Sequence, residues 1–369
     1  MINKFKKIVI KIGSSSIVDE NKGEIRKKWL NSICKDIELL KKEGKKIIIV
    51  TSGAVALGKK IISNKKSLHK LEDKQAAAAV GQIELSNNWQ KNLKKNNINS
   101  AQILLTLDDS EIRRRYLNIR KTIFSLHKNG IIPIINENDT VATEEIRYGD
   151  NDRLAARVSQ MIDADLLIML SEVDGLYTES PKKNKKAKKI IDIKKIDSTI
   201  EKMADGKFSK LGSGGMATKI WAAKICMSSG CSTVIADGHK YFPISKINYI
   251  NSTWFHASNS PSSSRKKWLL NHLHPSGTII IDKGAINAIL QNKSLLPAGV
   301  IEIIGKFNRG DVISITNENK EKIAIGVIAY DSYESKKIIG KKSKDIKIIL
   351  GYEGRDELIH KDDLVKIKI

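Results

Sequence analysis

The stretch IIPIINENDTVATEEIRYGDND, residues 131–152, decides our prediction of the fold. It opens as a continuous apolar run, which is typical of a strand buried on both faces of a parallel sheet, and we expect this strand to end where the polar run begins at Asn136. Asparagine and aspartate then gather in two clusters, at residues 136–139 and 150–152. A buried strand that leads directly into clustered amides and carboxylates predicts a ligand site at its carboxyl end.

The two clusters suit a small zwitterion. Amides can donate hydrogen bonds to a substrate carboxylate, and carboxylates can hold an ammonium group or orient lysines. We therefore take Asn136, Asp139, Asn151 and Asp152 as candidate site residues, with residues 141–148 between them folding back as a hairpin. The alternative is a capped turn without a ligand, because Asn and Asp favour turns and helix N-caps.

Length and composition limit the class of protein. The chain has 369 residues, of which 41% are hydrophobic, and no apolar run long enough to cross a bilayer. We therefore expect a globular, cytoplasmic protein of two domains with no membrane partner. The three cysteines form no C-x-x-C pair and have no histidine near enough to complete a zinc ligand set, so the sequence predicts no metal site of this kind.

The charge balance is strongly basic. A net charge of +24 ordinarily raises nucleic acid as a partner. Much of the excess is lysine in runs such as residues 182–189 (KKNKKAKK), which lack interleaved aromatic residues that would stack on bases. A binding patch is the alternative, but we attribute the excess to a compositional drift toward Lys, Ile and Asn and do not expect nucleic acid as a partner.

Upstream of the opening stretch, strands alternate with glycine loops and helices. A strand at residues 6–12 leads into Gly13 and three serines, and the next strand leads into Ser52 and Gly53. Backbone N–H groups in such loops can face an anion, and Lys11 adds a positive charge. A simple strand and turn with a surface lysine explains the first loop equally well. The repeated strand, glycine loop and helix predict a parallel α/β sheet.

Downstream the same alternation continues. The strand predicted at residues 165–170 leads to a turn in which Tyr177 either borders a nucleotide or forms part of an ordinary turn. The segment GSGGMATK, residues 212–219, then opens a helix, and a glycine-rich lead-in that points a helix N-terminus and Lys219 at an anion is a second phosphate-holding device. We also expect helices at residues 24–43, 74–97, 109–129 and 154–162, and strands at residues 100–105 and 232–236.

A shift in composition at residues 258–275 marks a domain boundary. Beyond it, short strand-like runs separated by glycines predict a small β-barrel with a helix at residues 284–291. We therefore divide the chain into a large domain at residues 1–258, a linker at 259–275 and a C-terminal domain at 276–369. The C-terminal domain is nearly balanced in charge, which argues against RNA binding that rests on phosphate neutralisation.

Two lysines in separate glycine-rich loops, with carboxylates near both, favour phosphoryl transfer. The transferring group spreads negative charge over its oxygens, so the protein acts mainly by aligning donor and acceptor and by neutralising charge. Other enzyme classes fit less well, because the sequence has no G-x-S-x-G nucleophile elbow, no G-x-G-x-x-G in a first βα turn and no H-E-x-x-H motif.

The chain resembles the glutamate 5-kinases of the amino acid kinase family along nearly its whole length. The matching motifs are VIKIGSS at 9–15, IVTSGAVALG at 49–58, PIINENDTVA at 133–142, GDND at 149–152 and GSGGMATK at 212–219. Toward the C-terminus, LLPAGV at 295–300, F-x-RGD-V at 307–312 and ILGYEG at 349–354 resemble a PUA domain. The resemblance implies a three-layer αβα sandwich with a mostly parallel central sheet for the kinase domain, followed by a small PUA-like β-barrel.

The resemblance also implies an activity, which is ATP-dependent phosphorylation of the L-glutamate γ-carboxylate to L-glutamyl 5-phosphate, the first step of proline biosynthesis. The transfer would be direct and in line. ATP and Mg²⁺ are the implied cofactors, with Mg²⁺ carried by ATP and no direct protein ligand. A homo-oligomer, dimer or tetramer, feedback inhibition by proline and a glutamyl-phosphate reductase as partner are implied in the same way.

Residue by residue, the resemblance assigns three sets of roles. The catalytic residues are Lys11 and Lys219, which contact the ATP phosphates, and Asp152, which orients the two lysines. Glutamate is assigned to Ser52, Gly53, Asn136, Asp139 and Asn151. ATP is assigned to Lys11, Gly13, Ser14, Ser171, Glu172, Ser213, Gly214, Gly215, Met216, Ala217, Thr218 and Lys219. The chain departs from many members at Ser171 and Glu172, where they carry Thr-Asp.

Three alternative functions stay open at this point. One is another carboxylate or carbamate kinase on the same fold. Another is an RNA-binding protein that acts through the PUA domain. The third is a degenerate enzyme retained for regulation, for which the departure at Ser171 and Glu172 is the only hint.

Overall fold

The structure of the protein is a computed structural model that describes residues 2–19, 21–63, 70–142, 151–181, 184, 186–204, 215–261 and 275–367. The chain forms two compact units, Met1–Pro261 and Ser262–Ile369. In the part of the chain that the structure describes, no helix has the length and apolar character needed to cross a membrane.

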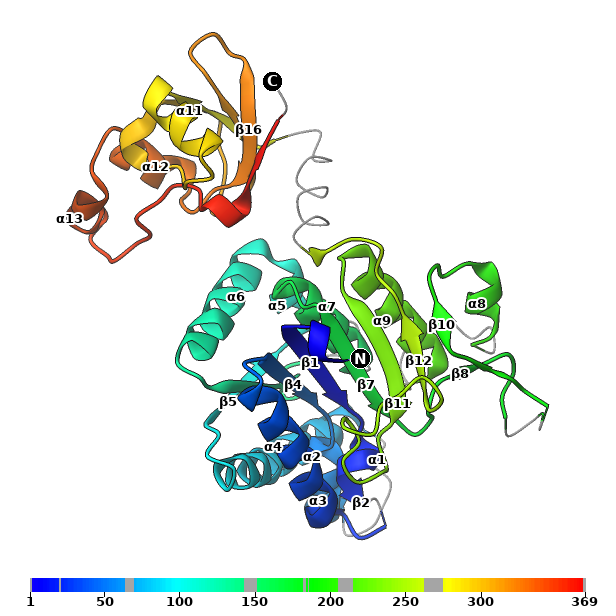
Figure 1. Ribbon diagram of the computed structural model, residues 1–369. Coiled ribbons are helices and arrows are strands. Elements are labelled where there is room, and N and C mark those ends of the chain that lie inside the picture. The colour runs from blue at the N-terminus through cyan, green and yellow to red at the C-terminus, as the bar shows by residue number, and fades with distance from the viewer. Residues whose placement is uncertain are drawn as a thin grey trace. The chain divides into compact units, whose positions relative to one another are not determined.

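An eight-stranded sheet forms the centre of the first unit (Figure 1). Its strands are β1 (Lys7–Ile12), β4 (Lys46–Thr51), β5 (Ser100–Leu105), β6 (Ile132–Glu137), β7 (Leu166–Ser171), β10 (Asp192–Ile193), β11 (Ser232–Asp237) and β12 (Ser252–Phe255). They lie in the order β10-β12-β11-β7-β1-β4-β6-β5, and each neighbouring pair is parallel except β11 and β12. Six strands, β1, β4, β5, β6, β7 and β11, therefore run in one direction and bring their carboxyl ends to the same edge of the sheet, whereas β10 and β12 run the opposite way.

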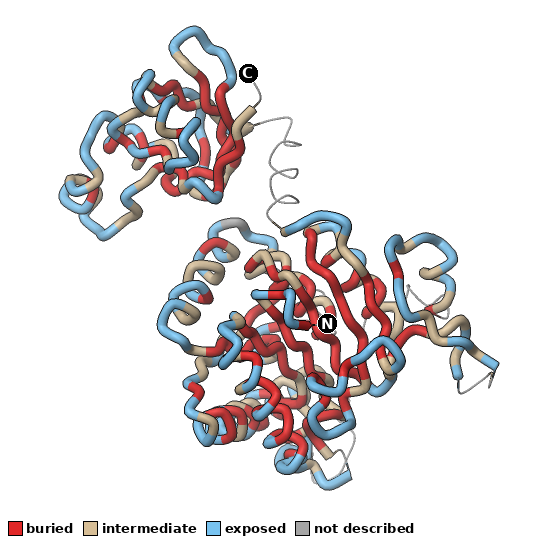
Figure 2. Tube along the Cα trace, in the orientation of Figure 1, coloured by how far each residue is buried: buried red, intermediate tan, exposed pale blue. Residues whose placement is uncertain are grey.

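Helices cover both faces of this sheet, so the unit is the three-layer αβα sandwich that the resemblance implied. On one face lie α2 (Lys27–Lys42), α3 (Ala54–Ser63) and α4 (Leu71–Lys94), and on the other α6 (Arg113–Lys128), α7 (Asn151–Met161) and α9 (Met216–Ser228). Figure 2 shows the strands buried between these layers. The smaller elements are α1 (Ser14–Ile17), β2 (Val18–Asp19), β3 (Glu24–Ile25), α5 (Leu107–Glu111), β8 (Leu176–Tyr177), β9 (Lys189–Ile190) and α8 (Ser198–Lys202).

The strands divide their side chains between the two faces. Along β1, Ile8 and Ile10 belong to the core under α2 and α4, whereas Val9 belongs to the core under α7 and α9. Successive side chains of a strand point to opposite faces. Lys11 therefore follows Val9 onto the face of α7 and α9.

Helices α3 and α4 cross at two glycines. A Cβ added to Gly58 would lie 1.8 Å from the carbonyl oxygen of Ala77, and one added to Gly81 would lie 1.9 Å from that of Ala54. No side chain fits at such distances, so glycine is required at both positions. The crossing holds the first turn of α3, directly after Gly53, against α4.

The second unit is built around a five-stranded sheet. Its strands are β13 (Gly277–Ile281), β14 (Val300–Ile304), β15 (Val312–Thr316), β16 (Lys322–Val327) and β17 (Leu364–Lys366), in the order β14-β13-β15-β16-β17. Three helices pack with it around one apolar core, namely α11 (Lys283–Leu290), α12 (Ser332–Ile338) and α13 (Ile346–Leu350). The sequence predicted α11 and four strand-like runs, at residues 277–281, 312–316, 323–330 and 364–369, which correspond to β13, β15, β16 and β17, but it missed β14, α12 and α13.

Some predicted elements have other bounds in the structure. The helix expected at residues 24–43 begins only at Lys27, because Glu24 and Ile25 form strand β3. Strand β6 does not stop before Asn136 but continues through Glu137, because both residues pair with β5 and their side chains are buried. The single helix expected at residues 109–129 is divided into α5 and α6 at Ile112, whose backbone is extended. Most of the hairpin expected at residues 141–148 lies outside the described residues.

Candidate active site

A cavity of about 740 Å³ opens at the carboxyl ends of β1, β4, β6 and β7. Loops from distant parts of the sequence meet in its walls, as the parallel sheet predicted. The predicted site residues that line it are Lys11, Gly13, Ser14, Ser52, Gly53, Asn136, Asp139, Asn151, Ser171, Glu172, Gly215, Met216 and Lys219.

A cluster of three charged residues stands at this cavity. Lys11 Nζ lies 2.6 Å from Asp152 Oδ1, and Lys219 Nζ donates to Asp152 Oδ2 at 2.9 Å. The Asp152 side chain is fully buried, whereas the two lysine side chains keep 7% and 9% of their exposure and line the cavity. Two ammonium groups thus face the cavity with one carboxylate behind them, which suits a phosphate group.

Each member of the cluster is placed by a different element. The strand alternation of β1 turns Lys11 toward α7 and α9, while Asp152 and Lys219 lie in the first turns of those two helices. Thr218, beside Lys219, also donates its hydroxyl to Asp152 Oδ2 at 3.0 Å. The carboxylate therefore ties one strand to two helices.

The lysines also determine the charge state of Asp152. Burial by itself would raise the pKa of this carboxyl, but the attraction of Lys11 and Lys219 and their hydrogen bonds outweigh burial and hold the pKa below its ordinary value. Asp152 is therefore ionised at neutral pH. It acts as a fixed negative charge that orients the two ammonium groups, not as a proton acceptor.

A cluster of amides forms another part of the wall. Asn151 Nδ2 lies 2.6 Å from the carbonyl oxygen of Thr51, 2.7 Å from Ser52 Oγ and 2.9 Å from Asn136 Oδ1. The Asn136 amide in turn donates to Gln82 Oε1 at 2.9 Å. Asp139 lines the same cavity two residues beyond the end of β6. Amide, hydroxyl and carboxylate groups therefore converge beside the lysine cluster.

The loop between β4 and α3 brings backbone close to the cavity. Gly53 has φ +112°, and a Cβ there would lie 2.9 Å from Val18 Cγ2, so a side chain is excluded on both counts. The first residues of α3, which start at Ala54, line the cavity. A helix N-terminus in this place favours an anion.

Two described residues of the nucleotide assignment, Ala217 and Thr218, are not among the cavity lining. Ala217 packs against the core under α7 and α9, and Thr218 is engaged with Asp152, so neither is among the described residues that line the cavity. Ser213 and Gly214 lie outside the described residues, as does Asp150 of the second polar cluster.

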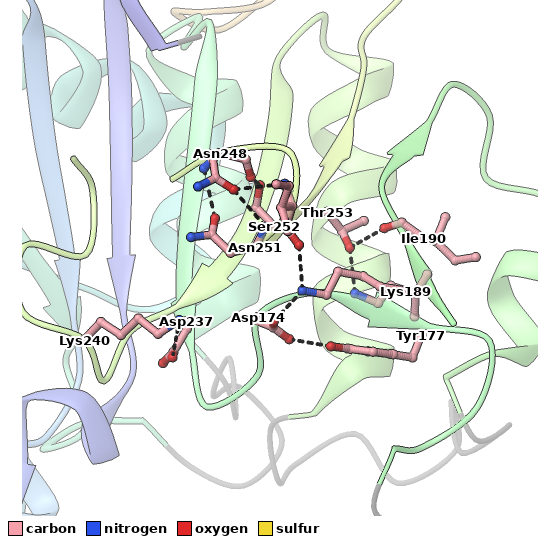
Figure 3. Close-up of polar contacts among 12 residues, drawn as sticks. Asp174, Tyr177, Lys189, Ile190, Asp237, Lys240, Asn248, Asn251, Ser252 and Thr253 are labelled. Atoms are coloured by element: carbon pink, nitrogen blue, oxygen red, sulfur yellow. Dashed lines mark hydrogen bonds and ion pairs between the residues drawn. The ribbon is translucent and has the colours of Figure 1, made fainter. Parts of the chain in front are cut away.

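Tyr177 does not line the cavity either, as far as the described residues show. Its hydroxyl donates to Asp174 at 3.0 Å, and Asp174 also pairs with the ammonium group of Lys189. Figure 3 shows Tyr177 and Lys189 converging on this carboxylate. Between the two interpretations of Tyr177, the ordinary turn is therefore the better one.

Sequence reasoning missed two charged residues of the cavity wall, Lys59 of α3 and Glu137 of β6. Lys59 is followed by Lys60, and such a pair is typical of a solvated surface. Which of the two faces the cavity depends on the residue at which α3 begins. Glu137 could have been found, because it lies within the polar run that led to the site.

Comparisons with known proteins agree with this architecture. Residues 6–237 match the amino acid kinase family, and residues 277–350 match the PUA domain. The carbamate kinase from Giardia lamblia bound to AMP-PNP aligns with 69% of this chain and 100% of its own, with a TM-score of 0.50 and 17% identity, which shows the fold alone.

Three curated relatives carry the name Glutamate 5-kinase. The protein of Paramagnetospirillum magneticum is 48% identical over 98% of this chain and 97% of its own length. That of Sinorhizobium fredii is 50% identical over 99% and 93%, and that of Agrobacterium fabrum is 51% identical over 97% and 92%. The chain therefore belongs to the amino acid kinase family, in the branch that the glutamate 5-kinases form.

Proposed function

We propose that this protein transfers the γ-phosphoryl group of ATP to the γ-carboxylate of L-glutamate, giving L-glutamyl 5-phosphate in the first step of proline biosynthesis. The observation that carries the proposal is the meeting of the cluster of Lys11, Asp152 and Lys219 with an amide cluster in one cavity. Phosphoryl transfer needs fixed positive charge, and an amino acid acceptor needs donors for its carboxylates and an acceptor for its ammonium group. The identity to the glutamate 5-kinases supports the same acceptor.

The amide cluster and Asp139 hold glutamate in this proposal. Ser52 and Asn136 lie beside Asn151 in the wall, so polar groups from two strand ends and one helix start can grip one small ligand. Asp139 supplies a negative charge for the α-ammonium group, while Gly53 leaves room for the reacting end of the substrate.

The lysine cluster acts on the transferred group. An oxygen of the γ-carboxylate attacks the γ-phosphorus in line as the bond to the bridging oxygen of ADP breaks. Lys11 and Lys219 neutralise the charge that spreads over the phosphoryl oxygens, and Asp152 keeps both ammonium groups in place. A carboxylate is ionised at neutral pH, so no general base is required.

The nucleotide is placed beside the loops after β1 and β7 and before α9. Gly13, Ser14, Ser171, Glu172, Gly215 and Met216 line the cavity there. Ser171 is buried and Glu172 is exposed. The side chain of Glu172, which is longer than the Asp of many relatives, can therefore extend into solvent without displacing Ser171.

The implied magnesium ion would bind the nucleotide and not the side chains of this site. No group of three or more His, Cys, Asp or Glu side chains suited to a metal ion occurs among the described residues, and the buried Asp152 carboxylate is engaged by two lysines. Mg²⁺ bound to the ATP phosphates would lower the charge that the lysines must offset. We propose that it enters with ATP.

The decisive test is ATP turnover by the purified protein that depends on both glutamate and Mg²⁺, with the acyl phosphate trapped by hydroxylamine as the hydroxamate. Aspartate, N-acetylglutamate and carbamate serve as competing acceptors. A hydroxamate that forms with glutamate and not with the others supports the proposal. Turnover of another acceptor, or none with glutamate, contradicts it.

Several further expectations stay predictions. We propose a catalytic domain at residues 1–258, a linker at 259–275 and a PUA domain at 276–369, which the two compact units and the two family matches support. A dimer or tetramer, inhibition by proline, transfer to a glutamyl-phosphate reductase and a cytoplasmic location rest on the resemblance and the sequence. RNA binding by the PUA domain is not favoured as an alternative function.

A further inference from the structure

A chain of hydrogen bonds leads out of the amide cluster into helix α4. Asn136 Nδ2 donates to Gln82 Oε1 at 2.9 Å, and Gln82 Nε2 donates to Ser86 Oγ, one turn along the helix, at 3.0 Å. Ser86 then donates to Gln102 Oε1 on β5. Gln82 is not among the described residues that line the cavity, and its printed link to the cavity wall is the hydrogen bond with Asn136.

The backbone carbonyl of Thr51 determines which group donates and which accepts in this series of hydrogen bonds. Asn151 Nδ2 lies 2.6 Å from the Thr51 carbonyl oxygen, and because a carbonyl can only accept, the nitrogen of Asn151 must face it. The same nitrogen lies 2.9 Å from Asn136, which must therefore present Oδ1 there. The Asn136 nitrogen is left for Gln82, which must present Oε1. The usual ambiguity between amide nitrogen and oxygen is thereby removed at three side chains.

The orientation of these amides decides which hydrogen-bond donors and acceptors the cavity wall presents to a ligand. The two hydrogens of the Asn151 amide are shared among three acceptors, so its nitrogen is saturated and its oxygen is left as the acceptor. Ser52 Oγ accepts from Asn151 at 2.7 Å, and its own hydrogen can donate. The wall therefore combines a hydroxyl donor for a carboxylate with an amide acceptor for an ammonium group.

We propose that Gln82 is a positioning residue for the acceptor substrate. Its Oε1 holds the amide of Asn136 in the orientation that Asn151 and Ser52 need to receive glutamate, so the inference rests on the proposed function. Gln82 is well placed for this role because the adjacent Gly81 lies against the first turn of α3, which follows the loop of Ser52. Without this acceptor, the buried Asn136 nitrogen loses its hydrogen bond to Gln82, and only the hydrogen bond from Asn151 still holds the amide.

Substitutions at residue 82 test the proposal. Gln82→Leu removes the acceptor at similar size, whereas Gln82→Glu keeps an oxygen toward Asn136 and can accept from Ser86 once that hydroxyl turns away from Gln102. Gln90→Leu makes the same change at an exposed position of the same helix and is the matched control. For each variant and the parent, the hydroxamate assay gives KM for glutamate, KM for ATP and kcat, and thermal unfolding with glutamate added reports binding without turnover.

We expect Gln82→Leu to raise KM for glutamate about ten- to hundredfold, the effect of one unsatisfied buried donor, with KM for ATP unchanged. The glutamate-induced rise in Tm should shrink in parallel, while Gln82→Glu and Gln90→Leu remain close to the parent. If Gln82→Leu does not fold, Gln82→Ala replaces it, with the same expected split between the two KM values.

The proposal is overturned by a folded Gln82→Leu or Gln82→Ala variant with unchanged KM for glutamate, by an equal rise in both KM values, or by a Gln82→Glu variant as defective as Gln82→Leu. Failure of the parent protein to phosphorylate glutamate is a separate result. It would remove the proposed function itself, and this inference with it.

Discussion

Replacement of Lys219 by alanine tests the lysine cluster most directly. Lys219 Nζ lies 2.9 Å from Asp152 Oδ2 and faces the cavity, where we place the transferred phosphoryl group. Removing one preorganised donor from a developing anion costs roughly 10²–10³ in kcat, or about 2.7–4 kcal/mol. Lys219 is not in the amide cluster, so KM for glutamate should change little.

The same substitution has a cost in stability that the assay must separate. Asp152 is fully buried and keeps Lys11 at 2.6 Å, so it loses one charged hydrogen bond, worth about 1.5–3 kcal/mol. Circular dichroism and denaturant unfolding first establish that the variant is folded at the assay temperature. Hydroxamate formation under saturating ATP and glutamate then gives kcat.

Lys224→Ala is the matched control for this variant. It lies on the same helix, is 60% exposed and pairs with Glu201, so its loss should leave kcat unchanged. If folded Lys219→Ala retains the parent kcat, or if its defect is confined to KM for glutamate, then Lys219 does not stabilise the transition state and our reading of the cluster is wrong.

Four further outcomes follow from the structure. Asp139→Ala should raise KM for glutamate by about tenfold or more in steady-state kinetics with KM for ATP unchanged, as expected for a charged hydrogen bond, and an unaltered KM for glutamate removes Asp139 from the site. Gly81→Ala should lower the free energy of unfolding by about 1–3 kcal/mol in urea, because its Cβ would press on the Ala54 carbonyl, and an unchanged midpoint contradicts the tight crossing. All three cysteines are buried, and burial raises the pKa of Cys34 to about 12, so a thiol reagent should label none in the native protein and three after denaturation. The depressed pKa of Asp152 contributes stability that is present above the pKa of the unfolded carboxyl and is lost as the pH falls through the folded value. Lys219→Ala brings the folded pKa of Asp152 closer to the unfolded one. We therefore expect this variant to unfold at a higher pH than the parent in an acid titration.

The sequence was most informative where one geometric rule covers many residues. Parallel strands bring their carboxyl ends to one edge, and this rule brought the loops after β1, β4, β6 and β7 together without any knowledge of contacts. It did not say how far each strand runs. Strand β6 continues through Asn136 and Glu137, because pairing with β5 and burial extend it beyond the apolar run.

The sequence also did not show which side chains at the start of a helix face the cavity. From GSGGMATK alone, each residue is equally able to face a ligand. In the structure the first turn of α9 directs Lys219 to the cavity, Ala217 to the core and Thr218 to Asp152, since neighbouring helical side chains point about 100° apart. The phase depends on where the helix begins, and that depends on packing against α7, which the sequence pattern does not encode.

The same rotation explains how one helix start serves both parts of the cavity. Asn151 and Asp152 are adjacent in the first turn of α7, yet Asn151 meets Ser52 and Asn136 while Asp152 meets Lys11 and Lys219. A helix that begins between the two clusters therefore fixes their separation by its own backbone geometry. Because that separation decides whether a carboxylate oxygen can lie in line with a phosphorus atom, a distortion of the backbone in the first turn of α7 should lower kcat even where the individual contacts of both clusters are kept.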